Sequence, residues 1–187
     1  MAKHVEIRLG GSGGQGLILA GVILAEAATI YDEKNAVQSQ SYGPEARGGA
    51  SRAEVIISDT DIDYPKATDI DVLLCLTQEA CDRYGGDLKG GGLMIVDEQE
   101  VGAPPSGDFR LVSLPILETA EQTIGKLLVA NIVALGALVQ LTRAVTKDAL
   151  RNAVLGRVPK GTEELNLAAL DAGFALGRAA QQELNGG

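Results

Sequence analysis

The sequence predicts an α/β fold with a Rossmann-like, mostly parallel sheet, helices on both faces and a helical C-terminal third. Stretches with strand and helix character alternate up to residue 114, and the chain is mainly helical from residue 118 onward. Residues 71–76 form a continuous apolar run of the kind that is typical of a central parallel strand. We expect one domain over residues 1–187.

The first elements are a strand, a glycine loop and a helix. Apolar and polar residues alternate over residues 4–9, and this period of two predicts a half-buried strand. Five glycines lie within residues 10–16 and mark a loop. Residues 17–31 lack proline and are rich in leucine, isoleucine and alanine, so a helix is expected there.

The same patterns define the remaining elements. Further strands are expected at residues 35–40, 53–58, 71–76, 93–96 and 109–114. Further helices are expected at residues 78–84, 118–124, 127–142, 146–155 and 162–184. A break near Gly125 separates two of these helices, and Thr146 is the candidate N-cap of another. The glycine-rich residues 41–49 and 85–92 predict a loop and a turn region.

Charge and composition remove several classes of protein. Sixteen basic residues against 25 acidic ones give a net charge of −9, which argues against a nucleic-acid partner. Two cysteines, Cys75 and Cys81, are too few for a zinc ribbon or an iron–sulfur cluster. Low cysteine usage without a signal peptide indicates the cytoplasm. The longest apolar stretch, residues 127–141, is too short to span a membrane comfortably.

Two of the expected helices, residues 17–28 and 127–141, have no broad polar face. A helix at the surface of a protein keeps one polar side. These helices therefore either lie between the sheet and other helices or contact another chain. The sequence leaves both possibilities open, including self-association of the isolated chain.

The first candidate binding site is the glycine loop. Its GxGxxG spacing lies between a strand and a helix, where glycines let an anion approach the backbone N–H groups. The candidate cofactor-binding residues of this loop are Gly11, Ser12, Gly13, Gly14, Gln15 and Gly16. The glycines could instead only allow close packing. A dinucleotide site would also need an acidic residue after the second strand, where the chain has Gln38-Ser39-Gln40.

The second candidate segment is SYGPEARGG at residues 41–49. An arginine flanked by glycines can present its guanidinium to a carboxylate or phosphate, so Arg47 is its main candidate contact, and Tyr42, Glu45 and Gly48 complete the set. The alternative is a turn whose charges are only solvated. Both segments could lie at the carboxyl edge of a parallel sheet, where such folds bind ligands.

Other reactive residues do not form a site in the sequence. We expect no catalytic and no metal-binding residue in this chain. His4 begins the first strand, Cys75 lies in an apolar run, and Cys81 could be exposed without any sign of activation. The aspartates of residues 59–71 lack a spacing that supplies a full oxygen shell for a metal.

Together, the GSGGQG and YGPEARGG motifs resemble the gamma subunit of 2-oxoacid:ferredoxin oxidoreductases, and the strand at residues 71–74 fits as well. The resemblance covers essentially the whole chain. The second motif looks most like the 2-oxoglutarate branch; pyruvate, branched-chain 2-oxoacid (ketoisovalerate) and indolepyruvate enzymes have related gamma parts. Ala46 stands where related loops commonly have a bulkier residue, so the packing of this loop could differ.

The resemblance implies an enzyme that decarboxylates a 2-oxoacid on thiamine pyrophosphate with Mg, passes electrons through iron–sulfur clusters to ferredoxin and forms an acyl-coenzyme A. It further implies that this chain is not catalytic alone, holds no cofactor tightly and packs with alpha, beta and ferredoxin-like subunits near the coenzyme A entrance. Two rival interpretations belong to other classes. One is a free-standing nucleotide-binding protein, and the other is a scaffold subunit without a ligand.

Overall fold

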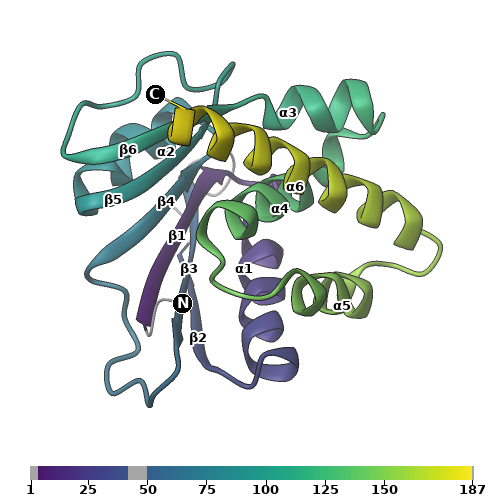
Figure 1. Cartoon of the computed structure of the whole chain (residues 1–187), viewed down its shortest axis with the longest axis horizontal. Helices are drawn as coiled ribbons and strands as arrows, with labels where there is room; N and C mark the ends of the chain where they lie inside the picture. The colour runs from purple at the N-terminus through teal and green to yellow at the C-terminus, as the bar shows by residue number, and fades with distance from the viewer. Residues whose placement is uncertain (1–3, 42–49, 187) are drawn as a thin grey trace.

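A computed structural model describes residues 4–41 and 50–186. Its centre is a six-stranded sheet with the order β2-β3-β1-β4-β5-β6 (Figure 1). The strands are β1 (His4–Ser12), β2 (Asn35–Ser41), β3 (Ala50–Ser58), β4 (Ile70–Cys75), β5 (Leu88–Asp97) and β6 (Phe109–Leu114). Strands β1, β4, β5 and β6 pair in parallel, whereas β3 is antiparallel to both β1 and β2. Within the described sheet, β3 is therefore the one strand that runs against the others.

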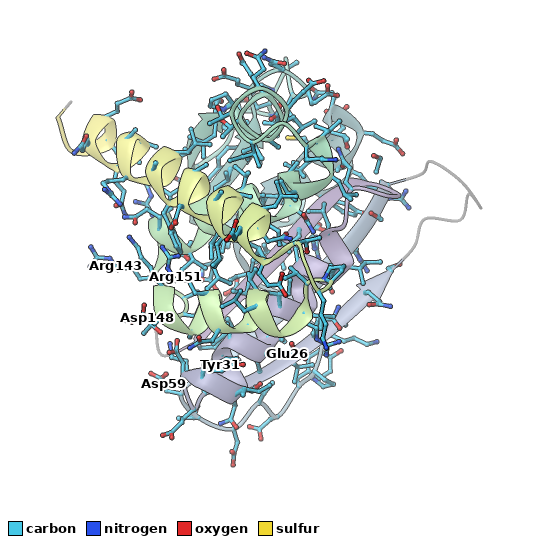
Figure 2. All side chains as sticks on the ribbon, turned by 90° about the vertical axis from the view of Figure 1, so that its right-hand side faces the viewer. Glu26, Tyr31, Asp59, Arg143, Asp148 and Arg151 are labelled. Carbon is cyan, nitrogen blue, oxygen red and sulfur yellow. The ribbon has the colours of Figure 1, made fainter. Side chains whose placement is uncertain are left out.

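Helices surround this sheet unequally. The helical elements are α1 (Leu17–Glu26), η1 (Ala27–Tyr31), α2 (Gln78–Tyr84), η2 (Gly85–Asp87), α3 (Ile116–Glu118), η3 (Thr119–Thr123), η4 (Leu127–Val129), α4 (Ala130–Thr142), α5 (Lys147–Arg157) and α6 (Glu163–Gly186). Helices α1, α4, α5 and α6 form the layer on one face, and the short α2 packs on the other (Figure 1). Helix α5 lies across the end of α1, with Glu26 and Tyr31 beside it (Figure 2).

The alternation of side chains along β4 explains its continuous apolar run. Val72 and Leu74 belong to the larger core under α1 and α4. Leu73 and Cys75 point to the other face and belong to the smaller core with α2. Since successive side chains in a strand point to opposite faces, a strand with helices on both sides must be apolar at nearly every position.

The apolar helix α4 is buried inside this chain. Every residue from Ala130 to Gln140 is buried, because α4 lies between the sheet and α6. Glycines let α4 and α6 approach to backbone contact: a Cβ built on Gly173 would lie 2.1 Å from the carbonyl oxygen of Val133. A Cβ on Gly136 would lie 2.5 Å from the carbonyl oxygen of Leu170. Of the two possibilities open for this helix, burial within the chain is the one that the structure shows.

Most of the expected elements are confirmed. The α/β class, the mostly parallel sheet, the helices on both faces and the helical last third are as predicted. Gly125, with φ +81°, interrupts the chain before α4, and the Thr146 hydroxyl accepts the N–H of Ala149 at the start of α5. The turn region expected at residues 85–92 is wrong in part, since β5 begins at Leu88 and Gly91, with φ +76°, lies within it.

No helix in the described ranges has both the length and the hydropathy needed to cross a membrane.

Candidate functional site

The glycine loop joins the carboxyl end of β1 to the start of α1, as the sequence predicts, but the loop is shorter than residues 10–16 because β1 continues through Gly10, Gly11 and Ser12. Ser12, the last residue of β1, pairs with Ala50, the first residue of β3. The second candidate segment therefore returns to the sheet directly beside the glycine loop. Its site residues Tyr42, Glu45, Arg47 and Gly48 lie outside the described residues.

Gln15 folds back across the loop and fixes its shape. Its side-chain Oε1 accepts the backbone N–H of Ser12 at 2.8 Å, and the backbone N–H of Gln15 donates to the Ser12 carbonyl at 3.3 Å. A Cβ built on Gly11 would lie 2.3 Å from this Oε1, so Gly11 leaves the space that the Gln15 amide occupies. The backbone N–H groups of Ser12 and Gln15 are thus both used inside the loop and are not directed toward a ligand.

Gly14 and Gly16 supply the backbone conformations that turn the chain into α1. Their φ angles are +91° and +74°, in the region that favours glycine. The space beside Gly14 is open, with no atom within 4 Å of a Cβ built there, and both Gly13 and Gly14 are exposed. Among the described residues, no side chain caps the N-terminus of α1. The edge at Gly13 and Gly14 is therefore where another molecule can approach the backbone.

Two polar residues that were not predicted from the sequence, one on α4 and one on β3, hydrogen-bond to the loop. Asn131, near the start of α4, donates its side-chain amide to the Gly16 carbonyl at 3.1 Å. Ser51 of β3 directs its hydroxyl to the carbonyls of Gly11 and Ser12, at 3.4 and 3.3 Å. An isolated asparagine inside an otherwise apolar helix was the available signal for Asn131, because a buried amide requires a partner.

Two cavities flank the loop on its apolar side. The first, of about 270 Å³, is lined by Gly14, Gln15, Leu117, Leu127, Leu128 and Ala130. The second, of about 250 Å³, lies between Gly16, Leu19 and Leu128 on one side and the Val158–Asn166 region on the other. Leu128 borders both cavities and is 82% exposed. The sequence predicts only that this region is apolar.

A buried charged cluster lies under the opposite face of β1. Arg8 is 5% exposed, and its guanidinium donates to Glu54 at 2.7 Å and to Asp87 and lies 5.5 Å from the Tyr84 ring centre. A Cβ on Gly10 would lie 2.9 Å from this ring. Because Arg8 of β1 contacts both Tyr84 of α2 and Asp87 of η2, this cluster anchors these two elements to the sheet.

The thiols are part of the smaller core. Cys75 and Cys81 are both fully buried, so the possibility that Cys81 is exposed is wrong. A hydrogen bond with Cys81, together with burial, raises the pKa of Cys75 well above the usual thiol range, and the same bond lowers the pKa of Cys81. Within residues 4–41 and 50–186, no group of three metal-ligating side chains could hold a metal ion.

The arrangement of strands bears on the dinucleotide interpretation. In a dinucleotide site the acidic residue lies at the end of the strand next to β1. Here β3 lies between β1 and β2, so β2 is one strand further out, about 10 Å from β1 at the usual strand spacing. The end of β2 is Gln38-Ser39-Gln40-Ser41, without an acidic residue.

An α/β sheet with a glycine loop at the carboxyl end of its first strand is a fold on which many proteins bind nucleotides, although the fold alone does not define the function. The family model for pyruvate ferredoxin/flavodoxin oxidoreductase matches residues 6–176, and the chain belongs to this family. It is 53% identical over 175 residues to the 2-oxoglutarate synthase subunit KorC of Methanocaldococcus jannaschii, covering 92% of this chain and 94% of that relative.

Solved structures agree with this assignment. The gamma subunit of a keto/oxoacid ferredoxin oxidoreductase from Geobacter sulfurreducens matches with a TM-score of 0.89 and 56% identity, covering 96% of this chain and 99% of that one. A 2-oxoglutarate:ferredoxin oxidoreductase from Magnetococcus marinus matches with a TM-score of 0.84 and 25% identity, covering 96% of this chain but 32% of that one. The resemblance drawn from the two motifs is confirmed, and the chain is a gamma-type subunit of the 2-oxoacid:ferredoxin oxidoreductases.

Proposed function

We propose that this chain, over residues 1–187, is one gamma-type domain of a 2-oxoglutarate:ferredoxin oxidoreductase, which forms an acyl-coenzyme A, CO2 and reduced ferredoxin. The KorC relative is named as a subunit of 2-oxoglutarate synthase, which supports 2-oxoglutarate as the substrate. The Magnetococcus marinus enzyme is described with 2-oxoglutarate, coenzyme A and succinyl-CoA bound. In this proposal the complex works in the cytoplasm, and alpha, beta and ferredoxin-like subunits carry the thiamine pyrophosphate, Mg and iron–sulfur clusters.

In this proposal, the role of this chain is to line the path by which coenzyme A reaches the active site. The open edge at Gly13 and Gly14 carries this proposal, because backbone N–H groups at the start of a helix attract phosphate and, among the described residues, no atom lies within 4 Å of a Cβ built on Gly14. Arg47 would add a cation from the neighbouring segment, which returns to the sheet at Ala50. The exposed backbone at Gly13 and Gly14 fits a phosphate at this edge. The Ser12 N–H would not contribute to its binding, because this group already donates to Gln15.

The decisive experiment measures the dependence of turnover on coenzyme A in the reconstituted complex. Arg47→Ala removes the proposed cation, and we expect the KM for coenzyme A to rise roughly tenfold, since a hydrogen bond to a charged group contributes about 1.5–3 kcal/mol. Arg110→Ala, at an exposed arginine on the edge strand β6, is the matched control and should leave this KM unchanged. An Arg47→Ala complex with wild-type assembly and wild-type KM would contradict the proposed contact.

A scaffold without a ligand is the second candidate, because Gln15 uses the Ser12 N–H inside the loop. Gly13→Val separates the two candidates. The added side chain should obstruct a molecule that approaches the loop edge and raise the KM for coenzyme A. Under the scaffold alternative, the Gly13→Val complex keeps both normal assembly and normal kinetics.

The free-standing nucleotide-binding alternative is tested with the isolated chain. A titration with NADPH should show no saturable binding, because the residue position that holds the ribose lies at the sheet edge and carries no acid. Tight, saturable binding would favour that alternative.

A further inference from the structure

Three exposed leucines, Leu19, Leu127 and Leu128, form an apolar patch beside the glycine loop that the proposed function does not explain. These side chains are 39%, 51% and 82% exposed, respectively. Single exposed apolar residues are common, but here they lie together at the mouth of two cavities. We call this group the leucine ledge.

The leucine ledge is built by the short helical turn η4, which precedes the buried helix α4. Gly125, with φ +81°, and the extended residue Lys126 redirect the chain so that Leu127 and Leu128 leave the core, while the next residue, Val129, is buried. The fold of this chain therefore presents Leu128 outward. A partner could pack against the exposed Leu128 side chain and place its own apolar side chains in the two adjacent cavities. Such packing is typical of the well-packed centres of protein interfaces.

The lengths of the similar proteins bear on which partner covers the leucine ledge. In the Methanocaldococcus jannaschii relative, the matched region is 94% of the protein. In the Magnetococcus marinus enzyme, the same fold is 32% of a longer chain, so it is joined to about twice its own length of polypeptide. The domain thus occurs both as nearly a whole subunit and as a covalent part of a larger one, and its contact with the remainder must use a surface of the domain itself.

We propose that the leucine ledge docks the subunit that corresponds to the remainder of that longer chain, with apolar side chains of the subunit entering the two cavities. This inference rests on the proposed function. The ledge adjoins Gly14 and Gln15, so docking there would place the partner directly beside the loop that lines the coenzyme A approach. The ledge also accounts for exposed leucines in a chain that buries its apolar helix α4 within itself.

The test uses the full chain and the other purified subunits of its enzyme. Leu128→Asp should raise the dissociation constant for the complex at least tenfold, which corresponds to about 1.4 kcal/mol. The melting temperature of the isolated chain should change by no more than about 2 °C, because this side chain is mostly in solvent. Leu128→Met keeps an apolar side chain of similar size and should retain wild-type affinity.

Ile30→Asp is the matched control. Ile30 is 62% exposed on η1, fourteen residues beyond Gly16 and about 20 Å along the helix, so this change should leave the affinity unaltered. Wild-type affinity of Leu128→Asp for the other subunits would overturn the inference. So would a Leu128→Asp variant that only converts a wild-type dimer of this chain into monomers, since the occupant would then be a second copy.

The outcomes separate this inference from the proposed function. At saturating concentrations of the other subunits, the Leu128→Asp complex should show a wild-type KM for coenzyme A. If assembly is insensitive to Leu128 while Arg47→Ala still raises that KM, the docking surface is wrong and the proposed function stands. If Leu128→Asp weakens assembly while Arg47→Ala changes nothing, the docking surface stands and the coenzyme A contact is wrong.

Discussion

Gly173 gives the sharpest prediction on stability, because it lies where α6 crosses α4. A Cβ at this position would lie 2.1 Å from the Val133 carbonyl oxygen, 2.9 Å from its carbonyl carbon and 3.0 Å from the Ala137 nitrogen. A carbon and a carbonyl oxygen in contact are normally about 3.3–3.6 Å apart. Since all three neighbours are backbone atoms, Gly173→Ala cannot be accommodated by rotating a side chain and must push the two helices apart.

The magnitude follows from two opposing effects. Overpacking of a core costs about 1–3 kcal/mol, occasionally more. Alanine in place of glycine returns up to about 1 kcal/mol through helix propensity. Because the shortfall here exceeds about 1 Å against rigid atoms, we expect a net loss of about 2–3 kcal/mol in the free energy of unfolding. For a protein of this size that is a fall in melting temperature of roughly 4–12 °C, measurable by calorimetry.

Gly156 is the matched control for this prediction. It also lies in a helix, α5, but the nearest atom to a Cβ built there is the Tyr31 hydroxyl oxygen at 3.8 Å. Gly156→Ala should therefore be neutral or stabilising by up to about 1 kcal/mol. If Gly173→Ala melts at or above the wild-type temperature, the two helices do not meet at backbone distance and the reasoning is refuted.

Three further substitutions test other parts of the fold. Thr146→Ala removes the N-cap of α5 and should cost about 1 kcal/mol in urea unfolding, with Thr146→Ser restoring most of it; equal midpoints for the alanine variant and wild type would refute the cap. The hydrogen bond from Arg157 lowers the pKa of Glu26, so this carboxylate adds stability above its ordinary pKa and loses it as the pH falls through the lowered value. The melting temperatures of wild type and Glu26→Gln should thus differ at pH 7 and converge in acid, and a constant difference would contradict this. Asp97→Ala leaves three backbone N–H groups without their buried acceptor and should cost about 3 kcal/mol or more, with Asp97→Asn retaining part of it; a calorimetric loss under 1 kcal/mol would count against this role.

The sequence predicted the elements better than their arrangement. Apolar periodicity located nearly every strand and helix, because burial of one face dictates it locally. Strand direction has no such signature: β3 is buried at nearly every position, as the parallel strand β4 is, yet it runs antiparallel to β1. Loop length was the usable signal, since the connection between β2 and β3 is shorter than the dozen or more residues of a parallel crossover.

The candidate site was predicted in part. The GxGxxG spacing located the loop, because a strand followed by glycines and a helix is a local pattern. It could not reveal that Gln15 bonds to Ser12, nor that Asn131 and Ser51 hold the loop from α4 and β3. The contacts of Asn131 and Ser51 join residues far apart in the chain, and one sequence carries no direct record of such pairs. The bond between Gln15 and Ser12 is local, but it depends on the side-chain conformation of Gln15, which the sequence pattern does not give.

The sequence by itself determined the α/β class, the position of the glycine loop and, through two motifs, the family. These depend on local backbone preference and on residues that are close together in the chain. The tertiary structure decided how the apolar helices are used. It buries α4 within the chain and leaves Leu128 in solvent. The close contact between α4 and α6 uses three of the 24 glycines, Gly136, Gly173 and Gly177. The physical reason is that burial depends on what packs against a side chain, and only the folded chain supplies those neighbours.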